Sequence, residues 1–456
     1  MKNHRREAFK SLYKRTVGAA IMAVLVLLSI YMWYGKFNLL METRFSGKGN
    51  ILMVAMYAIE QFALVYALGG FKIGYNKGLN VVLSQIFAVI IGDLLLWGQI
   101  VLTIGNVFHL KEIGTGILWL GLMHIASCII LTTFFIALYG RLFPPYRMLM
   151  IHGEHSNELR KKVNSRRDKY RICEEISINL GLKEIQRKMS NYDAVLLNDI
   201  PSTEKNRILK YCFDHSIRVY FTPKLSDIIV KGTDEVDLFD SPLFLCKNFG
   251  LNFEQRFIKR LCDILFSAVG LVITSPILLI TAIAIKLGDK GPVIYSQKRC
   301  SLNGKEFMVY KFRSMVVDAE KDGIVQLAKN NDSRITKVGG FIRRVRIDEL
   351  PQLINVLKGD MSLVGPRPER PDFIEKFSKE IPEFSYRLKV KGGLTGYAQV
   401  FGKYNTSPYD KLKMDLMYIV NYSILLDIQI MILTLKVIFR KESTEGFQKK
   451  EERDWQ

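Results

Sequence analysis

Two adjacent carboxylates, Asp348 and Glu349, come directly after a basic run that contains Arg343, Arg344 and Arg346. Carboxylates beside arginines stay ionised, and an arginine guanidinium binds phosphate through two parallel hydrogen bonds. An aspartate can also attack phosphorus and form an acyl phosphate. The pattern therefore favours phosphoryl chemistry on a polyanionic substrate, although a salt-bridged start of a surface helix would have the same composition.

A second motif follows, in which Arg367 stands between Pro366 and Pro368 and is followed by Glu369. The two prolines hold the backbone around the arginine in an extended turn. All six histidines lie at or before position 215, so the C-terminal half of the chain has none for acid–base or nucleophilic chemistry. Its carboxylates are the candidates for those roles.

The composition limits the class of protein. A chain of 456 residues is long enough for two or three domains. The formal net charge of +21 suits anionic lipid headgroups or phosphorylated substrates. Nucleic acid is disfavoured, because no basic stripe with interleaved aromatic residues occurs. The six cysteines are scattered without a CxxC pair, which indicates reduced thiols and neither a disulfide framework nor a zinc site.

The first 142 residues are dominated by apolar runs, each close to the roughly 20 residues that a helix needs to cross a bilayer. The runs cover about 17–34, 50–70, 80–104 and 114–140. The first run has no small-residue cleavage site, so it is not read as a cleavable signal. The basic N-terminus predicts a cytoplasmic start and, after four spans, a cytoplasmic return. Glu60 and Asp93 lie inside two of the runs and are expected to pack between helices.

A soluble α/β module is predicted over roughly 146–250, where short apolar strands alternate with helical patterns. The strands are expected at 147–151, 193–197 and 217–221, and the helices at 178–189 and 203–213. The loop after the first strand runs from His152 to Ser156 and has one glycine, whereas a dinucleotide fingerprint needs three. A structural or regulatory role is therefore favoured over cofactor binding, and His152 and His155 are interpreted as loop histidines, without a third metal ligand.

The apolar segment 261–287 can be read as a fifth span, but two features favour a re-entrant helix. Pro276 follows Ser275 near its middle, where a proline removes one helical hydrogen bond and clashes with the preceding turn. Basic residues flank both ends, which fits two cytoplasmic ends. The carbonyl of Val272, freed by the proline, is expected to accept a hydrogen bond from the Ser275 hydroxyl.

Two further helices are predicted in the C-terminal part. One helical face is marked by Leu350, Leu353, Ile354 and Leu357, and the helix is expected to stop at Lys358-Gly359. The range 418–439 is strongly apolar but interrupted by charges such as Asp427, which predicts a helix lying at the membrane interface.

The chain resembles the bacterial polyprenyl-phosphate hexose-1-phosphate transferases, the monotopic phosphoglycosyl transferases, over about 253–440. The resemblance rests on six motifs in the order of that family: Arg256–Arg260, Ser275–Pro276, Tyr310–Met315, Asp348–Leu353, Gly365–Glu369 and Gly393–Gly396. The front half matches the large form of the family in layout. The implied architecture is α/β with membrane helices: four transmembrane helices in 1–144, a Rossmann-like parallel module in 145–250, and a mainly α catalytic domain in 251–456 with a re-entrant helix at 261–287.

The resemblance implies transfer of a hexose 1-phosphate from a UDP-sugar to undecaprenyl phosphate, with release of UMP. Asp348 corresponds to the nucleophile of the family, and Glu349 to its partner in holding Mg²⁺. Arg343 corresponds to a phosphate contact, and Arg367, with Pro366, Pro368 and Glu369 around it, is expected near the uridine diphosphate. Lys311 and Arg313 are interpreted as either phosphate contacts or fold contacts.

The implied setting is the bacterial cytoplasmic membrane, with the catalytic domain facing the cytoplasm, in the first step of exopolysaccharide, capsule or O-antigen synthesis. The identity of the sugar and the presence of a homodimer stay open. Two alternatives also remain. One is a metal-dependent glycosyltransferase that makes a lipid-monophosphate sugar, although no Asp-x-Asp occurs in the chain. The other is a membrane scaffold or sensor of polysaccharide assembly.

Overall fold

A computed structural model describes residues 2–41, 43–105, 109–153, 159–238, 240–246, 250–317, 332, 334–402 and 406–438. The chain forms two compact units, Met1–Thr222 and Pro223–Gln456. The predicted module was expected to continue to residue 250. The structure divides after Thr222 instead, because Leu225 and Ile228 pack into the hydrophobic core of the second unit.

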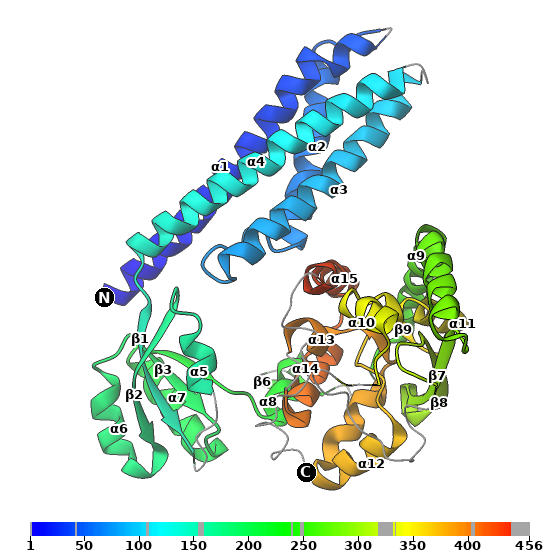
Figure 1. The fold of residues 1–456 in the computed structure, drawn as a ribbon. Coiled ribbons are helices and arrows are strands. Elements are labelled where there is room, and N and C mark those ends of the chain that lie inside the picture. Colours follow the sequence, from blue (N-terminus) through cyan, green and yellow to red (C-terminus); the bar gives the residue numbers. More distant parts are fainter. Residues whose placement is uncertain are drawn as a thin grey trace. The chain divides into compact units, whose positions relative to one another are not determined.

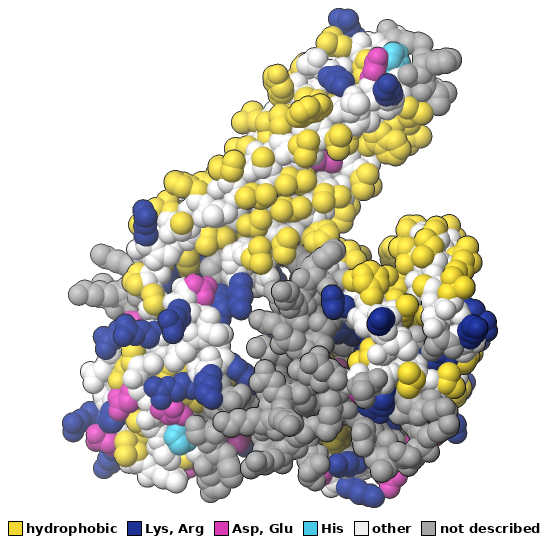
Figure 2. Space-filling model, viewed as in Figure 1, with side chains coloured by type: hydrophobic (Ala, Val, Ile, Leu, Met, Phe, Trp, Pro, Cys, Tyr) yellow, Lys and Arg dark blue, Asp and Glu magenta, His cyan; other side chains and the backbone are white. Residues whose placement is uncertain are grey.

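The first unit begins with long helices that pack along one another (Figure 1). They are α1 (Lys2–Gly35), α2 (Lys48–Ala67), α3 (Gly78–Ile104) and α4 (Leu110–Leu142), with a short 3₁₀ turn, η1 (Phe37–Leu40), after α1. Hydrophobic side chains cover the visible face of this bundle, and Lys and Arg side chains gather near its ends (Figure 2). Five described helices, α1–α4 and α9 of the second unit, are long and apolar enough to cross a membrane.

The two acids in the apolar runs lie between helices, as expected. Asp93 is 4% exposed, and its carboxylate lies 3.1 Å from Nδ1 of His124 in α4 and accepts a hydrogen bond from the Tyr57 hydroxyl at 3.3 Å. Glu60 accepts a hydrogen bond from Nε2 of Gln99 at 2.6 Å. Both acids therefore join neighbouring helices of the bundle through polar contacts.

A small parallel sheet completes the first unit. Its elements are β1 (Tyr146–His152), α5 (Leu159–Asn164), β2 (Tyr170–Ser177), η3 (Ile178–Leu180), α6 (Leu182–Met189), β3 (Ala194–Asn198), α7 (Ser202–Asp214) and β4 (Arg218–Phe221). The strand order is β2-β1-β3-β4, with every neighbouring pair parallel. The prediction of a parallel α/β module is confirmed, but it missed β2, whose charged residues hide the apolar alternation of a strand.

The second unit holds the rest of the chain. Its first part comprises α8 (Leu225–Lys231), β5 (Asp234–Leu238), β6 (Ser241–Leu245), α9 (Phe253–Asp289), β7 (Ile294–Cys300), η4 (Leu302–Gly304), β8 (Glu306–Phe312), α10 (Lys337–Arg344) and η5 (Ile347–Glu349). The remainder comprises α11 (Gln352–Lys358), β9 (Ser362–Val364), α12 (Pro371–Glu380), η6 (Pro382–Lys389), β10 (Gly393–Thr395), α13 (Tyr397–Phe401), α14 (Pro408–Val420) and α15 (Ile424–Ile438). The strands of this unit pair in short two-stranded sheets, β5 with β6, β7 with β8, and β9 with β10.

Helix α9 includes Ser275 and Pro276, where a break was predicted. The helix continues through Pro276, and the Ser275 hydroxyl donates to the carbonyl oxygen of Val272 at 2.8 Å, as expected. The bond gives a partner to the carbonyl that the proline deprives of its helical donor. The re-entrant path of α9 stays a prediction.

The prediction of one interfacial helix over 418–439 is wrong in its bounds. The chain is helical in α14 and again in α15, with Asn421–Ser423 between them. Ser423 separates the two, because its hydroxyl accepts a hydrogen bond from the amide of Leu426 and starts a new helix. Asp427 is mostly buried and pairs with Lys259 of α9 at 2.6 Å, so its charge stabilises a contact inside this unit.

Candidate functional site

The carboxylate pair lies on a tight turn between two helices. The hydroxyl of Thr336 accepts a hydrogen bond from the amide of Gly339 and caps the start of α10. At the other end, Arg346 adopts a left-handed backbone conformation, with φ of 60°. The chain then forms η5, which carries both carboxylates, and Pro351 leads into α11. The predicted helical stop at Gly359 is confirmed, with φ of 90°.

Glu349 is held by three cations that come from separate segments. Its Oε1 lies 3.0 Å from Nζ of Lys311 in β8 and 2.8 Å from Nη2 of Arg367. Its Oε2 lies 3.8 Å from Nη1 of Arg346. Burial opposes ionisation, but Arg367, Lys311 and Arg346 hold the pKa of the Glu349 carboxyl well below its usual range. Glu349 is therefore a fixed negative charge that joins three parts of the site.

Asp348 has a different environment, although it is the next residue. The residue is 9% exposed, and its Oδ1 is buried without a hydrogen-bond partner among the described residues. Burial and the neighbouring charge of Glu349 raise the pKa of the Asp348 carboxyl to about 6, against the opposing effect of Lys311, Arg346 and Arg343. One carboxylate is thus engaged by cations, while the other keeps an oxygen atom available for a ligand or for attack.

The turn at residues 366–369 is held by hydrogen bonds that its backbone carbonyls accept from other segments. The amide of Gly393 donates to the carbonyl of Pro366 at 2.8 Å, and Nη2 of Arg387 donates to the carbonyl of Arg367 at 3.1 Å. Glycine is required beside the turn, because a Cβ atom on Gly365 would lie 2.4 Å from the carbonyl oxygen of Lys391. The guanidinium of Arg367 is consequently presented to Glu349 from a rigid loop, and Glu349 raises the pKa of Arg367.

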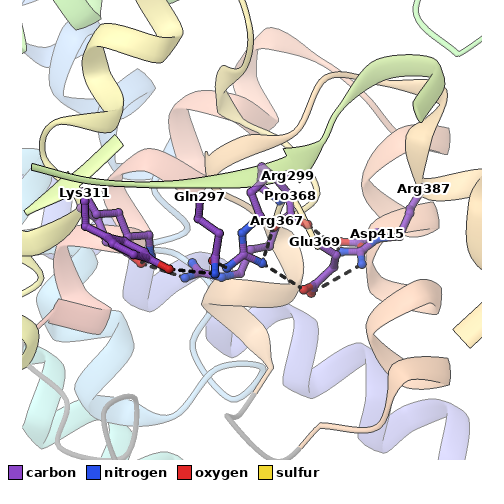
Figure 3. Close-up of polar contacts among 10 residues, drawn as sticks. Gln297, Arg299, Lys311, Arg367, Pro368, Glu369, Arg387 and Asp415 are labelled. Carbon is purple, nitrogen blue, oxygen red and sulfur yellow. Dashed lines mark hydrogen bonds and ion pairs between the residues drawn. The ribbon is translucent and has the colours of Figure 1, made fainter. Parts of the chain in front are cut away.

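A second ion-pair network joins Glu369 of this turn to residues of other elements (Figure 3). Glu369 lies 3.7 Å from Nη1 of Arg299 in β7 and 3.6 Å from Nη1 of Arg387 in η6. Arg387 is 3% exposed, and its Nη2 lies 2.8 Å from Oδ2 of the buried Asp415 in α14. Sequence reasoning missed Arg299, Arg387 and Asp415, because they lie far apart in the chain and form no local motif.

The other candidate residues, Arg343 and Arg313, differ in their exposure to solvent. Arg343 is half-buried in the last turn of α10, and its charge lowers the pKa of Asp348 without a hydrogen bond or ion pair to a described residue. Arg313 is 6% exposed and packs against Gly291, where any side chain larger than hydrogen would collide with the guanidinium. The structure brings Lys311, Glu349 and Arg367 together, whereas Arg313 lies outside that contact.

Asp348 and Glu349 could hold a metal ion without a third protein ligand. Within the described part of the chain, no three His, Cys, Asp or Glu side chains are close enough to hold a metal ion. Mg²⁺ in phosphoryl-transfer sites needs only one or two carboxylates, because substrate phosphates and water supply the other ligands. The unpartnered Oδ1 of Asp348 beside Glu349 fits such a site. His152 is hydrogen-bonded to the adjacent Gly153 carbonyl, and His155 lies outside the described residues.

Comparison with known proteins identifies the second unit. The sequence pattern of the family described as bacterial sugar transferase matches residues 254–441. A protein of Bacillus subtilis (strain 168), provisionally named an undecaprenyl-phosphate N-acetylgalactosaminyl 1-phosphate transferase, is 57% identical over 131 residues, which are 29% of this chain and 73% of that protein. The chain belongs to the bacterial sugar transferase family.

Other members of the sugar transferase family are similar over longer stretches. The UDP-N-acetylgalactosamine-undecaprenyl-phosphate N-acetylgalactosaminephosphotransferase of Aeromonas hydrophila is 40% identical over 262 residues, which are 54% of this chain and 59% of that protein. The UDP-glucose:undecaprenyl-phosphate glucose-1-phosphate transferase of Escherichia coli (strain K12) is 43% identical over 211 residues, which are 45% of this chain and 44% of that protein. The matches thus span about half the length of these two relatives, and the two names differ in the sugar.

Proposed function

We propose that this sugar transferase moves a sugar 1-phosphate from a UDP-sugar to undecaprenyl phosphate and releases UMP, in polysaccharide synthesis at the cytoplasmic membrane. The observation that carries the proposal is the contrast within the carboxylate pair. Asp348 has a buried oxygen without a hydrogen-bond partner among the described residues, while Glu349 is fixed by Lys311 and Arg367. The names of the relatives support the choice of donor and acceptor.

In the proposed first step, a carboxylate oxygen of Asp348 attacks the phosphorus that carries the sugar. The bond from that phosphorus to the bridging oxygen of the diphosphate breaks, and UMP leaves with the bonding electron pair. In the second step, a phosphate oxygen of undecaprenyl phosphate attacks the same phosphorus, and the bond to Asp348 breaks. The carboxylate of Asp348 is thereby regenerated, and the sugar ends on a lipid diphosphate.

The surrounding cations would stabilise the charge that develops on the transferred phosphoryl group. Arg367 offers a planar fork of donors from a rigid turn, and Lys311 adds a point charge from β8. Arg343, close enough to influence the pKa of Asp348, would contact a phosphate oxygen. Asp348 and Glu349 would hold Mg²⁺, which neutralises diphosphate charge when it is bound.

Product analysis tests the proposal. Purified full-length protein in lipid nanodiscs is incubated with undecaprenyl phosphate and a panel of UDP-glucose, UDP-galactose and UDP-N-acetylgalactosamine. Release of UMP with one of these donors, together with a lipid diphosphate product, is the expected result. Release of UDP would instead mean glycosyl transfer to a lipid monophosphate, and no turnover with an active control enzyme in the same assay would favour a scaffold. The panel also identifies the sugar.

A further inference from the structure

A group of basic side chains lies in the first unit, where the bundle meets the parallel sheet. The loop from α2 to α3 carries Tyr75, and two lysines approach its ring. Nζ of Lys14 in α1 lies 3.8 Å from the ring centroid, and Nζ of Lys169, just before β2, lies 5.0 Å from it. The two ammonium groups are therefore no farther apart than the sum of these distances.

The nearby carboxylates are already paired with other cations. Glu7 lies 2.6 Å from Nη2 of Arg218 and 3.5 Å from Nζ of Lys10. Asp168 accepts two hydrogen bonds from Arg166, both of 2.9 Å. Within the described residues, neither Lys14 nor Lys169 makes a side-chain hydrogen bond or an ion pair, and the ammonium group of each lies against an aromatic ring. The group thus holds five cations and two carboxylates.

The arrangement is built into the fold. Arg166 also donates from Nη1 and Nη2 to the carbonyl oxygen of Tyr75, at 3.4 and 3.3 Å, and fixes the loop against the sheet. Lys14 projects from a turn of α1, and Lys169 is fixed by the backbone pairing of its carbonyl with the amide of Tyr146. Both lysines are partly buried, and their like charges repel one another. Burial also lowers the pKa of Lys169.

We propose that Lys14, Lys169 and Tyr75 form a binding site for a phosphate group, borne by an anionic lipid headgroup or free in solution. A phosphate group offers several oxygen atoms, and each can accept a charge-assisted hydrogen bond of about 2.8 Å from an ammonium group. Lys14 lies in the basic N-terminal part of α1, before the apolar run of that helix, and Tyr75 follows the C-terminal end of α2. For helices that cross a membrane, these positions correspond to the level of phospholipid headgroups. It is independent of the carboxylate pair and of the function proposed for it.

Lysine reactivity tests the site without a substitution. Full-length protein is placed in nanodiscs of phosphatidylcholine alone or mixed with phosphatidylglycerol, and the acetylation rate of each lysine is measured by mass spectrometry. We expect acetylation of Lys14 and Lys169 to slow several-fold with phosphatidylglycerol. Lys77, an exposed lysine of the same loop, is the internal control and should change little. A third arm adds inorganic phosphate to the phosphatidylcholine nanodiscs.

The arms distinguish the two sources of phosphate. Protection by phosphatidylglycerol alone assigns a lipid headgroup, and protection by inorganic phosphate assigns a phosphate that is free in solution. In either case Lys169→Gln should abolish most of the protection of Lys14, while Lys77→Gln leaves it unchanged. Unchanged rates in both arms would overturn the proposal. Equal slowing of Lys14, Lys169 and Lys77 would also overturn it, because that outcome reports general screening by a charged surface.

Discussion

Arg367 and Glu349 are joined by an ion pair of 2.8 Å between Nη2 and Oε1. The arginine belongs to the turn between β9 and α12, and the glutamate to η5 before α11. The pair therefore sets the distance between the two sequence motifs that carry the candidate site. It also leaves the neighbouring Asp348 without a guanidinium partner among the described residues, because Arg367 is directed to Glu349.

Substitution of Arg367 should reduce turnover strongly. Arg367→Gln removes both the charge and the donor fork, and UMP release should fall by about 10²–10³-fold, the usual effect of removing one donor that stabilises transition-state charge. Arg367→Lys keeps the charge without the planar fork, so its loss should be smaller. Lys379→Gln, on the exposed face of α12, is the surface control and should behave as wild type. Wild-type turnover of Arg367→Gln would remove this residue from the site.

The buried pair of Arg387 and Asp415 should matter for stability. Arg387→Met leaves the Asp415 carboxylate without its partner inside the second unit, which costs about 3–5 kcal/mol when a buried pair is broken. The double variant Arg387→Met with Asp415→Leu removes both charges and should regain part of that loss. Thermal unfolding in detergent ranks the stability of the wild type, the Arg387→Met variant and the double variant. A double variant that is less stable than Arg387→Met would contradict this account.

The pH dependence of the first step should report Asp348. Burial and Glu349 raise the pKa of Asp348 to about 6, while Arg367, Lys311 and Arg346 keep Glu349 ionised well below that pH. A protonated carboxyl cannot attack phosphorus, so the rate should fall about tenfold per pH unit below the pKa and be flat above it. Bound Mg²⁺ would move the midpoint to lower pH. Single-turnover UMP release across the acidic and neutral range measures the profile, where about pH 6 is the expected midpoint without metal. A rate that rises on acidification would contradict the role of an ionised Asp348.

Local sequence signals were sufficient for much of the fold. The apolar runs predicted α1–α4 in their central parts, because length and hydropathy alone define such helices. The predicted strands near 147–151, 193–197 and 217–221 match β1, β3 and β4, since buried parallel strands are continuous apolar runs. β2 was missed because it lies at the edge of the sheet, where charged residues such as Glu174 and Glu175 are tolerated.

The site was predictable where its residues are close in sequence. Asp348 with Glu349, and Arg367 between two prolines, were recognised from composition and spacing. The pairing of Lys311 with Glu349 depends on β8 lying against η5, which no local pattern specifies. Arg299, Arg387 and Asp415 were missed for the same reason, because ion pairs between distant segments depend on tertiary structure.

The path of α9 can be tested by cysteine labelling in a cysteine-free background. Glu254→Cys and Pro292→Cys flank the apolar stretch of this helix. Both positions should react with a membrane-impermeant reagent only from the cytoplasmic side, if the helix returns to the face from which it enters. Pro276→Leu should favour a straight helix and lower turnover, because the flanks would be misplaced. Labelling of position 292 from the outer side would mean a true fifth span.

The central claim is that Asp348 carries the transferred phosphosugar, and trapping of that species tests it most directly. Full-length protein is mixed with a UDP-sugar labelled in the sugar, without undecaprenyl phosphate, and is quenched and separated under denaturing conditions. Wild type should retain label, and undecaprenyl phosphate should release it. Asp348→Asn should retain none, because an amide cannot form the acyl phosphate. Retention of label by Asp348→Asn at the wild-type level would contradict the assignment of Asp348 as the nucleophile.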